Sequence, residues 1–172
     1  MKNTSNTISF PSNLIHRTLH GRMLSLMFLL LGALIGITWL MVYIMVSSIL
    51  EEYIGRNALN VSKAVSLTTV VQEGLKNNNS SKIQMYAESV RKATGARFVV
   101  VGDHEGRRYS HPVPERIGKF MVGGDNPRAL EKGEAYVSKA VGTLGPSMRG
   151  KVPIFDDTGK VIGVVSVGYL QE

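Results

Sequence analysis

The sequence predicts an α+β protein in which one membrane-spanning helix precedes a single domain, and in that domain the helices come before an antiparallel sheet. Three observations lead to this prediction. Residues 23–50 contain no charged side chain. Residues 49–75 carry apolar side chains at helical spacing. From residue 97 onward the apolar side chains alternate with a period of two, which is typical of strands.

Residues 23–48 are predicted to form a transmembrane helix, since about 20 consecutive apolar residues suffice to span a bilayer. The tail at residues 1–22 contains Lys and Arg but no acid, whereas two glutamates follow the apolar run. Because basic flanks stay on the cytoplasmic side, we expect a cell-membrane protein with a cytoplasmic tail and with residues 49–172 outside. A cleaved signal peptide would have a shorter run that ends in small residues, and this run passes through Trp39 without such a site.

The helices of the external domain are expected to come first. Neither proline nor a turn interrupts the apolar pattern from residue 49 to about residue 75, so we expect one continuous helix there. The asparagines at 77–79 favour a turn that ends this helix. Ser80 or Ser81 is expected to cap a second helix, and Gly95 to close it.

Five strands are then expected to form one antiparallel sheet, at residues 97–101, 107–111, 134–141, 148–155 and 160–169. Asp156-Asp157-Thr158-Gly159 is typical of the hairpin turn that would join the last two strands. In the loop between the second and third strands, Asp125 is expected to cap a short helix that ends at Leu130.

Composition and motifs exclude several functions. The chain has no cysteine, so the domain folds without disulfides. Neither a His-Glu-x-x-His metal motif nor a Gly-x-Ser-x-Gly nucleophile motif is present, so no catalytic residue, metal site or cofactor is predicted for this chain. The net charge of +7 includes three cations in the tail, and the remaining basic residues are scattered. A small anion is therefore expected as the ligand, and nucleic acid is not.

A candidate anion site lies late in the chain. Arg149 and Lys151 are two apart on a predicted strand, so their side chains leave the same face. Residues 142–147 form a glycine-broken loop just before them, and its exposed backbone N–H groups suit a carboxylate. Ser166 interrupts an apolar strand, where its hydroxyl needs a partner.

A second pair of candidates, Arg108 and His111, lies near the end of another predicted strand. Strict alternation places these two side chains on opposite faces of that strand. They can act together only if the chain bends before Pro112.

Beyond single motifs, a set of segments covering nearly all of residues 95–170 shares one pattern. These segments are residues 101–103, 108–112, 117–119, 123–125, 142–145, 149–154 and 162–169. Together they resemble the extracytoplasmic sensor domain of the citrate/C4-dicarboxylate sensor histidine kinases.

The resemblance implies a PAS-like (PDC/Cache-type) ligand-binding domain between two membrane helices, so we expect this chain to be a fragment that ends before the second. It also implies a homodimer, a cytoplasmic kinase core that uses ATP, and a partner response regulator. The fragment itself is expected to have no enzyme activity. A membrane-tethered binding module without a kinase and an ectoenzyme that turns over a bound acid remain alternatives.

The resemblance also implies roles for nine site residues. Arg108 and His111 would hold one carboxylate, and Met121 would close over the ligand. A second carboxylate would be held by Arg149 and by the backbone of the loop residues Gly142, Thr143 and Leu144. Lys151 would take a further carboxylate or a hydroxyl, and Ser166 would donate a hydrogen bond.

Lys151 favours citrate within this family. Citrate sensors resemble this chain in the Arg-Gly-Lys sequence, whereas C4-dicarboxylate sensors tend to have an aromatic residue at the position of the lysine. Val100 departs from the citrate pattern, in which a threonine can stand at that position. We therefore expect a citrate sensor, with a sensor of malate, fumarate or succinate as the alternative.

Overall fold

The computed structural model describes residues 12–170, with side chains from Leu19 onward. It divides into two compact units at the boundary between Ser48 and Ile49. The first eleven residues of the predicted tail lie outside the described part. The predicted division of the chain into tail, membrane helix and domain otherwise stays a prediction.

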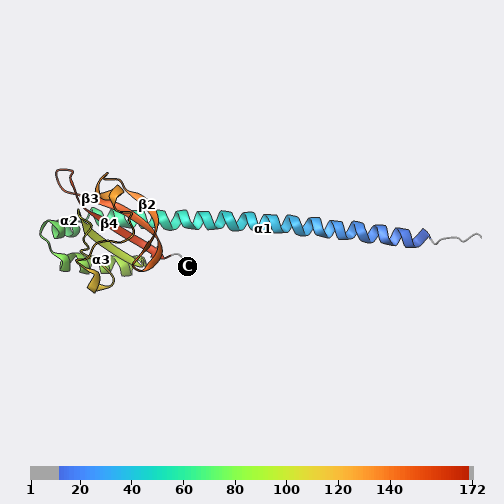
Figure 1. Ribbon diagram of the computed structural model, residues 1–172, viewed down its shortest axis with the longest axis horizontal. Helices are drawn as coiled ribbons and strands as arrows, with labels where there is room; N and C mark the ends of the chain where they lie inside the picture. Colours follow the sequence, from blue (N-terminus) through green and yellow to red (C-terminus); the bar gives the residue numbers. More distant parts are fainter. Residues whose placement is uncertain (1–11, 171–172) are drawn as a thin grey trace, which may run out of the picture. The chain divides into compact units, whose positions relative to one another are not determined.

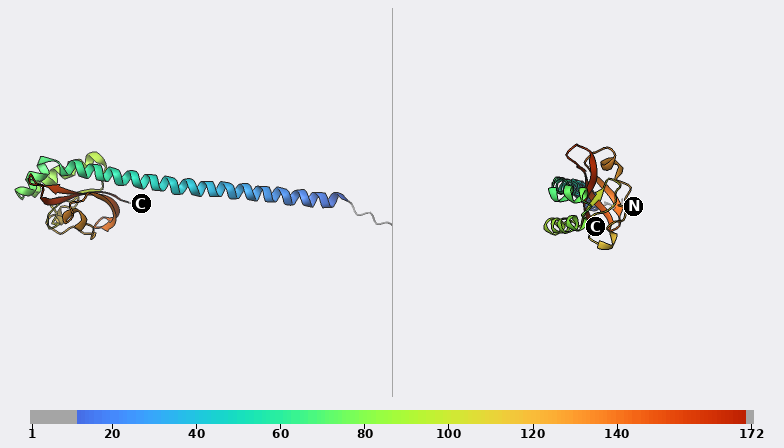
Figure 2. Two further views of the ribbon diagram at one scale, coloured as in Figure 1. Left: turned by 90° about the horizontal axis from the view of Figure 1, so that it is seen from above. Right: turned by 90° about the vertical axis from the view of Figure 1, so that its left-hand side faces the viewer.

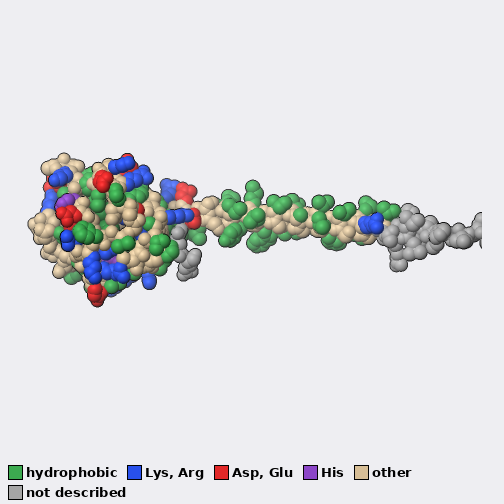
Figure 3. All heavy atoms as spheres, viewed as in Figure 1, with side chains coloured by type: hydrophobic (Ala, Val, Ile, Leu, Met, Phe, Trp, Pro, Cys, Tyr) green, Lys and Arg blue, Asp and Glu red, His purple; other side chains and the backbone are tan. Residues whose placement is uncertain are grey.

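Helix α1 (Ser12–Ser66) contains the apolar run. Its residues 19–66 include a window with a mean hydropathy of 2.4, none of which is buried inside the structure. Apolar side chains project from the helix in Figure 3, and Trp39 is 72% exposed. A helix that is apolar all round and covered by no protein suits a lipid environment. It is the one helix in the described residues that is long and apolar enough to cross a membrane.

The predicted α+β class is confirmed, but the prediction of five strands is wrong. The described residues contain one sheet of four strands in the order β1-β4-β3-β2, with every neighbouring pair antiparallel (Figure 1). The strands are β1 (Phe98–Asp103), β2 (Tyr136–Gly142), β3 (Gly145–Phe155) and β4 (Val161–Leu170).

The segment 107–111 is not a regular strand, because it pairs with the end of β1 only briefly: the Asp103 N–H donates to the Arg107 carbonyl at 3.0 Å and the Tyr109 N–H to the Val101 carbonyl at 2.7 Å. Only isolated bridges form, at Arg107 and Arg108. The Ser110 hydroxyl accepts the Val101 N–H at 2.8 Å, and the Ser110 N–H donates to the Val101 carbonyl at 3.3 Å. One residue thus satisfies both backbone groups that a paired strand would need.

The helices after α1 are α2 (Thr69–Lys76), α3 (Ser80–Thr94), the short 3₁₀ turn η1 (Pro114–Arg116) and α4 (Pro127–Leu130). The expected continuous helix from 49 to 75 is wrong, since α1 ends at Ser66 and α2 starts after Thr68. Thr68 has extended backbone angles, and its hydroxyl lies 3.0 Å from the Tyr86 hydroxyl of α3. This break lets Val71 and Leu75 turn into the core beside Val65.

The ends of α3 were predicted with mixed success. The cap at its start is Asn79, whose side chain accepts the Lys82 N–H at 3.0 Å, so the prediction of a Ser80 or Ser81 cap is wrong. The asparagine was read only as a turn residue. Gly95 closes the helix with a φ of 67°, as expected for a left-handed C-cap.

The helices cover one face of the sheet (Figure 2). Alternate residues of β1 and β4, such as Val99 and Val167, pack there with Val65, Val71 and Ile83 into one apolar core. The remaining residues of the same strands point to the opposite face.

Helix α1 lies directly on β3 at Gly150. A Cβ at Gly150 would overlap the backbone of Ala58 and Leu59. The Ser62 hydroxyl donates to the Gly150 carbonyl at 2.8 Å and accepts the Val167 N–H at 3.2 Å. This close contact fixes the helix on the sheet and leaves the other face for a site.

Candidate ligand-binding site

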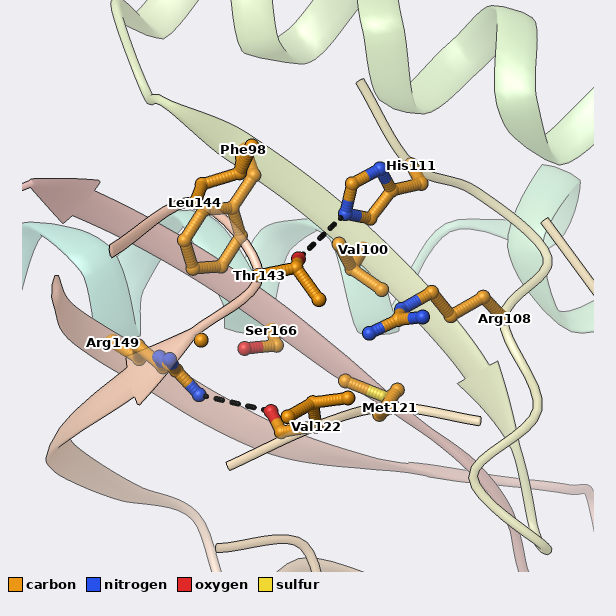
Figure 4. Close-up of a pocket in the computed structure, with 11 residues that line it drawn as sticks. Phe98, Val100, Arg108, His111, Met121, Val122, Thr143, Leu144, Arg149 and Ser166 are labelled. Carbon is orange, nitrogen blue, oxygen red and sulfur yellow. Dashed lines mark hydrogen bonds between the residues drawn. The ribbon is translucent and has the colours of Figure 1, made fainter. Parts of the chain in front are cut away.

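A cavity of about 30 Å³ lies on the sheet face opposite the helices. Cross-strand pairing arranges the strands beneath it in two rows: Lys151 pairs with Ser166, which pairs with Val100, and Arg149 pairs with Gly168, which pairs with Phe98. The floor of the cavity is formed by Ser166, Val100, Arg149 and Phe98. The loop that contains Met121 and the turn between β2 and β3 complete its walls. In Figure 4, Arg108 and His111 lie on one side and Arg149 on the other, with Ser166 between them.

Eight of the nine residues that we expected to contact a ligand line this cavity. They are Arg108, His111, Met121, Gly142, Thr143, Leu144, Arg149 and Ser166. The ninth, Lys151, is not among the lining residues. Phe98 and Val122 also line the cavity and were missed. Period-two spacing from Val100 would have indicated Phe98, whereas Val122 is placed by a loop whose path the sequence does not show.

Arg108 is buried, with 5% of its surface exposed, and no acceptor for its guanidinium is found among the described residues. Its guanidinium opens on the cavity, since no fully enclosed side-chain nitrogen or oxygen in the described part of the chain lacks a partner. The charged residue that affects its pKa is another cation, Arg116. Burial first and Arg116 second lower the pKa of Arg108. A buried guanidinium without a counter-ion is unfavourable in the empty domain, so its acceptor is expected to come from outside the chain.

His111 lies beside Arg108 as a neutral imidazole. Burial lowers its pKa to about 4, and the charge of Arg108 adds to this effect. Its Nδ1 lies 3.0 Å from the Val113 nitrogen and 3.2 Å from the Val113 carbonyl oxygen, and its Nε2 lies 3.3 Å from the Thr143 hydroxyl. That contact joins the two sides of the cavity.

The position of His111 resolves the problem of alternation. The side-chain amide of Gln84 on α3 donates to the His111 carbonyl at 3.0 Å and accepts the His111 N–H at 2.9 Å. Gln84 therefore makes the two hydrogen bonds to the His111 backbone that a neighbouring strand would otherwise make. Arg108 and His111 face the same cavity because residues 107–111 are not a regular strand.

Arg149 is held by neutral acceptors as well as by a charge. Its Nε donates to the Ser147 hydroxyl at 2.8 Å and its Nη2 to the Ala140 carbonyl at 3.0 Å. Two glycines make room for it, since a Cβ at Gly142 or Gly123 would overlap the guanidinium. Burial lowers the pKa of Arg149, and Asp125 partly opposes this.

Asp125 is the residue that sequence reasoning misassigned. Helix α4 has Asn126 at its N-cap position, without a side-chain capping bond, so the expected Asp125 cap is wrong. The Asp125 carboxylate instead lies 3.4 Å from Arg149 Nη1 and 3.2 Å from Lys151 Nζ, and it accepts the Ser138 hydroxyl at 2.6 Å. Burial raises the pKa of Asp125, but these cations and hydrogen bonds outweigh it and the net pKa is lowered.

Lys151 is fully buried, with 0% of its surface exposed. Its ammonium donates to Asn126 Oδ1 as well as contacting Asp125. Burial lowers the pKa of Lys151, and the charge of Asp125 opposes the shift. Its expected role as a ligand contact stays a prediction, because protein groups surround it in this structure.

An antiparallel sheet with helices on one face and a cationic cavity on the other defines a small α+β domain of the PAS-like class. Residues 45–172 match the family model described as single cache domain 3. The chain therefore belongs to the single cache domain 3 family.

Known proteins similar to the chain are sensor kinases. The Sensor protein CitS of Halalkalibacterium halodurans is 59% identical over 124 residues, which cover 72% of this chain and 23% of that protein. The Sensor histidine kinase CitA of Klebsiella pneumoniae is 41% identical over 123 residues, covering 72% of this chain and 22% of that protein. The chain thus spans about a quarter of the length of these curated relatives.

A solved structure supports the fold directly. The crystal structure of the Escherichia coli DcuS sensor domain superposes with a TM-score of 0.66 at 35% sequence identity, and the match covers 70% of this chain and 90% of that one. The Escherichia coli sensor histidine kinase DcuS is also 37% identical over 124 residues. The same fold and a related sequence therefore occur in a sensor domain.

Proposed function

We propose that residues 49–172 are the sensor domain of a membrane histidine kinase and that the cavity binds a small carboxylate, with citrate as the ligand. The observation that carries this proposal is Arg108. A buried guanidinium without an acceptor among the described residues, beside a neutral His111, is an incomplete site that an anion completes.

The other groups around the cavity suit a carboxylic acid that also has a hydroxyl group. Ser166 is buried at the centre of the floor, and its hydroxyl is free of protein hydrogen bonds in the described residues. Thr143 and Leu144 lie in the tight turn between β2 and β3, which places their backbone next to the cavity. One carboxylate would bind at Arg108 and His111, and another near Arg149.

The cavity must expand to accept any such acid. Its volume of about 30 Å³ is well below the roughly 150 Å³ of a cavity that holds a molecule as small as benzene. The His111–Thr143 contact and the loop with Met121 close it. We infer that ligand entry separates these two walls, and that the described conformation is a contracted one.

Similarity favours citrate over C4-dicarboxylates. The relative at 59% identity is named CitS, whereas the DcuS relatives are 37% identical and the probable C4-dicarboxylate sensor kinase of Bacillus subtilis is 34% identical. Lys151 adds a cation near the cavity, as a third carboxylate would require. A C4-dicarboxylate remains the second candidate because Asp125 already neutralises part of that charge.

The whole protein would extend beyond this chain. We propose an N-terminal tail in the cytoplasm, a second membrane helix after the sensor domain, and a kinase core that uses ATP and passes its phosphoryl group to a response regulator. The chain would act as a homodimer. These proposals rest on similarity to the sensor kinases, of which this chain spans about a quarter.

Calorimetry of the 172-residue chain in detergent micelles tests the proposed function. Citrate, isocitrate, malate, fumarate and succinate are titrated, and citrate is expected to bind at least about tenfold more tightly than malate, a difference of about 1.4 kcal/mol. Arg108→Ala is expected to abolish binding. Arg107→Ala is the matched control, since the Arg107 side chain is exposed and does not line the cavity.

Two results would change the proposal. Tighter binding of malate or fumarate than of citrate would make the chain a C4-dicarboxylate sensor. Loss of binding in both arginine variants alike would remove the assignment of Arg108. Analysis of the titrated acid for products tests the ectoenzyme alternative.

A further inference from the structure

The two sides of the cavity differ in how their cations are balanced. On one side, the guanidinium of Arg108 has no acceptor in the described part of the chain. On the other, Arg149 and Lys151 both lie against the carboxylate of Asp125, at 3.4 and 3.2 Å. The protein therefore supplies its own anion to one half of the site only.

The side chains of Asp125 and Asn126 hold the ammonium group of Lys151. This ammonium is completely buried. Lys151 does not line the cavity. A ligand carboxylate can reach this ammonium only by taking the place of one of those two side chains.

The loop that carries Asp125 has the backbone freedom for such an exchange. Gly123 and Gly124 precede it, with φ angles of 131° and 68° that favour glycine. The Ser138 hydroxyl, 2.6 Å from Oδ2, is a neutral donor that does not depend on either cation. Asp125 can thus lose Lys151 without losing every partner.

We propose that Asp125 is a specificity-determining residue whose carboxylate competes with the third carboxylate of a triply charged ligand for Lys151. This inference rests on the proposed function, namely that the cavity binds small carboxylates. A doubly charged acid fills the site between Arg108 and Arg149 and leaves Asp125 in place. A triply charged acid can bind Lys151 only after it displaces Asp125. Asp125 therefore reduces the preference of the site for a ligand with three carboxylates over a ligand with two.

Asp125→Asn tests the competition, because asparagine has the same shape and still accepts from Ser138 and Lys151 but has no charge. Calorimetry on the 172-residue chain in detergent at about pH 8, where carboxylic acids are ionised, compares citrate with malate. The dissociation constant for citrate is expected to fall about tenfold, equivalent to about 1.4 kcal/mol. The constant for malate should change much less, so the citrate-to-malate affinity ratio rises.

Asp157→Asn is the matched control. It removes one negative charge at an exposed position, where Asp157 pairs with Lys76 far along the chain from the site, and the affinity ratio should not change. A purely structural role for Asp125 would weaken both acids in parallel and leave the ratio constant, which would overturn the inference. Failure of the unsubstituted chain to bind either acid would instead remove the proposed function, and this inference with it.

A second measurement does not depend on a folded variant. In the unsubstituted chain labelled with ¹³C at aspartate carboxyl groups, the signal of Asp125 should move on addition of citrate, because the carboxylate leaves Lys151. Malate should move it less. An Asp125 signal that responds equally to saturating citrate and malate contradicts displacement.

Discussion

The two faces of the sheet use the same four strands in opposite ways. On the helix face, apolar side chains and a glycine form a core in which the buried hydroxyl of Ser62 has three hydrogen-bond partners. On the cavity face, Arg108, Arg149 and Lys151 are almost as deeply buried, and Arg108 has no acceptor for its guanidinium among the described residues. The helix face therefore stabilises the folded domain, whereas the buried cations of the cavity face cost folding free energy until a ligand binds.

Two glycines of β2 and β3 give the largest expected difference between the faces. Gly150→Ala puts a methyl group into the backbone of α1, which cannot move without leaving the sheet, and should destabilise the domain by about 3 kcal/mol. Gly142→Ala instead meets the end of the Arg149 side chain. It should weaken citrate binding and leave the unfolding free energy nearly unchanged. Chemical denaturation and calorimetry of both variants check this, and equal losses of stability would contradict the division between the faces.

A pH effect of similar size is expected from His111 on the cavity face. Its pKa is about 4 in the folded domain, against 6.5 without burial. Between these values the unfolded chain binds a proton at His111 and the folded domain does not, so stability should rise as pH rises from about 4 to 6.5. The gain is up to about 3 kcal/mol.

Denaturation of the chain across this pH range, compared with His111→Gln, measures that gain. The lowered carboxyl pKa of residues such as Asp125 and Glu88 produces a slope in the same direction, but at lower pH and in both proteins. The difference between the two curves therefore isolates the histidine. An identical pH dependence in both would show that His111 is protonated in the folded domain as readily as in the unfolded chain.

Arg108→Met gives the smallest expected change, and its sign is the informative part. Removing a buried cation without an acceptor should stabilise the empty domain by at least about 1 kcal/mol, while abolishing ligand binding. Arg149→Met is the contrast, since it leaves the Asp125 carboxylate with one cation fewer and should lower stability. Thermal melting of both variants without ligand compares them, and a destabilised Arg108→Met would show that Arg108 supports the fold.

Local patterns predicted much of this molecule. The uncharged run before Glu51, the glycine that closes α3 and the hairpin turn at Asp156 follow from sequence-local physics. The cavity residues were identified because their motifs resemble a known family, and eight of nine come together in space. Their shared position around the cavity does not test their roles in binding, but it shows that the motifs lie together in the folded domain.

The errors came from contacts between residues distant in sequence. Residues 107–111 have the alternation of a strand, but Gln84 on α3 and Val101 on β1 take their backbone bonds. Asp125 precedes a short helix, as a cap does, but two cations 24 and 26 residues later draw its carboxylate away. The break after Ser66 depends on packing against α3. None of these partners is visible in the local pattern.

The position of Trp39 determines which part of this protein tryptophan fluorescence reports on. It is the single tryptophan of the sequence and lies on the apolar part of α1, so indole emission arises from the membrane segment and is silent about the cavity. A tryptophan placed at Val122, on the cavity wall, in a chain with Trp39→Phe would give an optical signal from the site alone. The sequence thus allows the two units of the molecule to be observed separately, one fluorophore at a time.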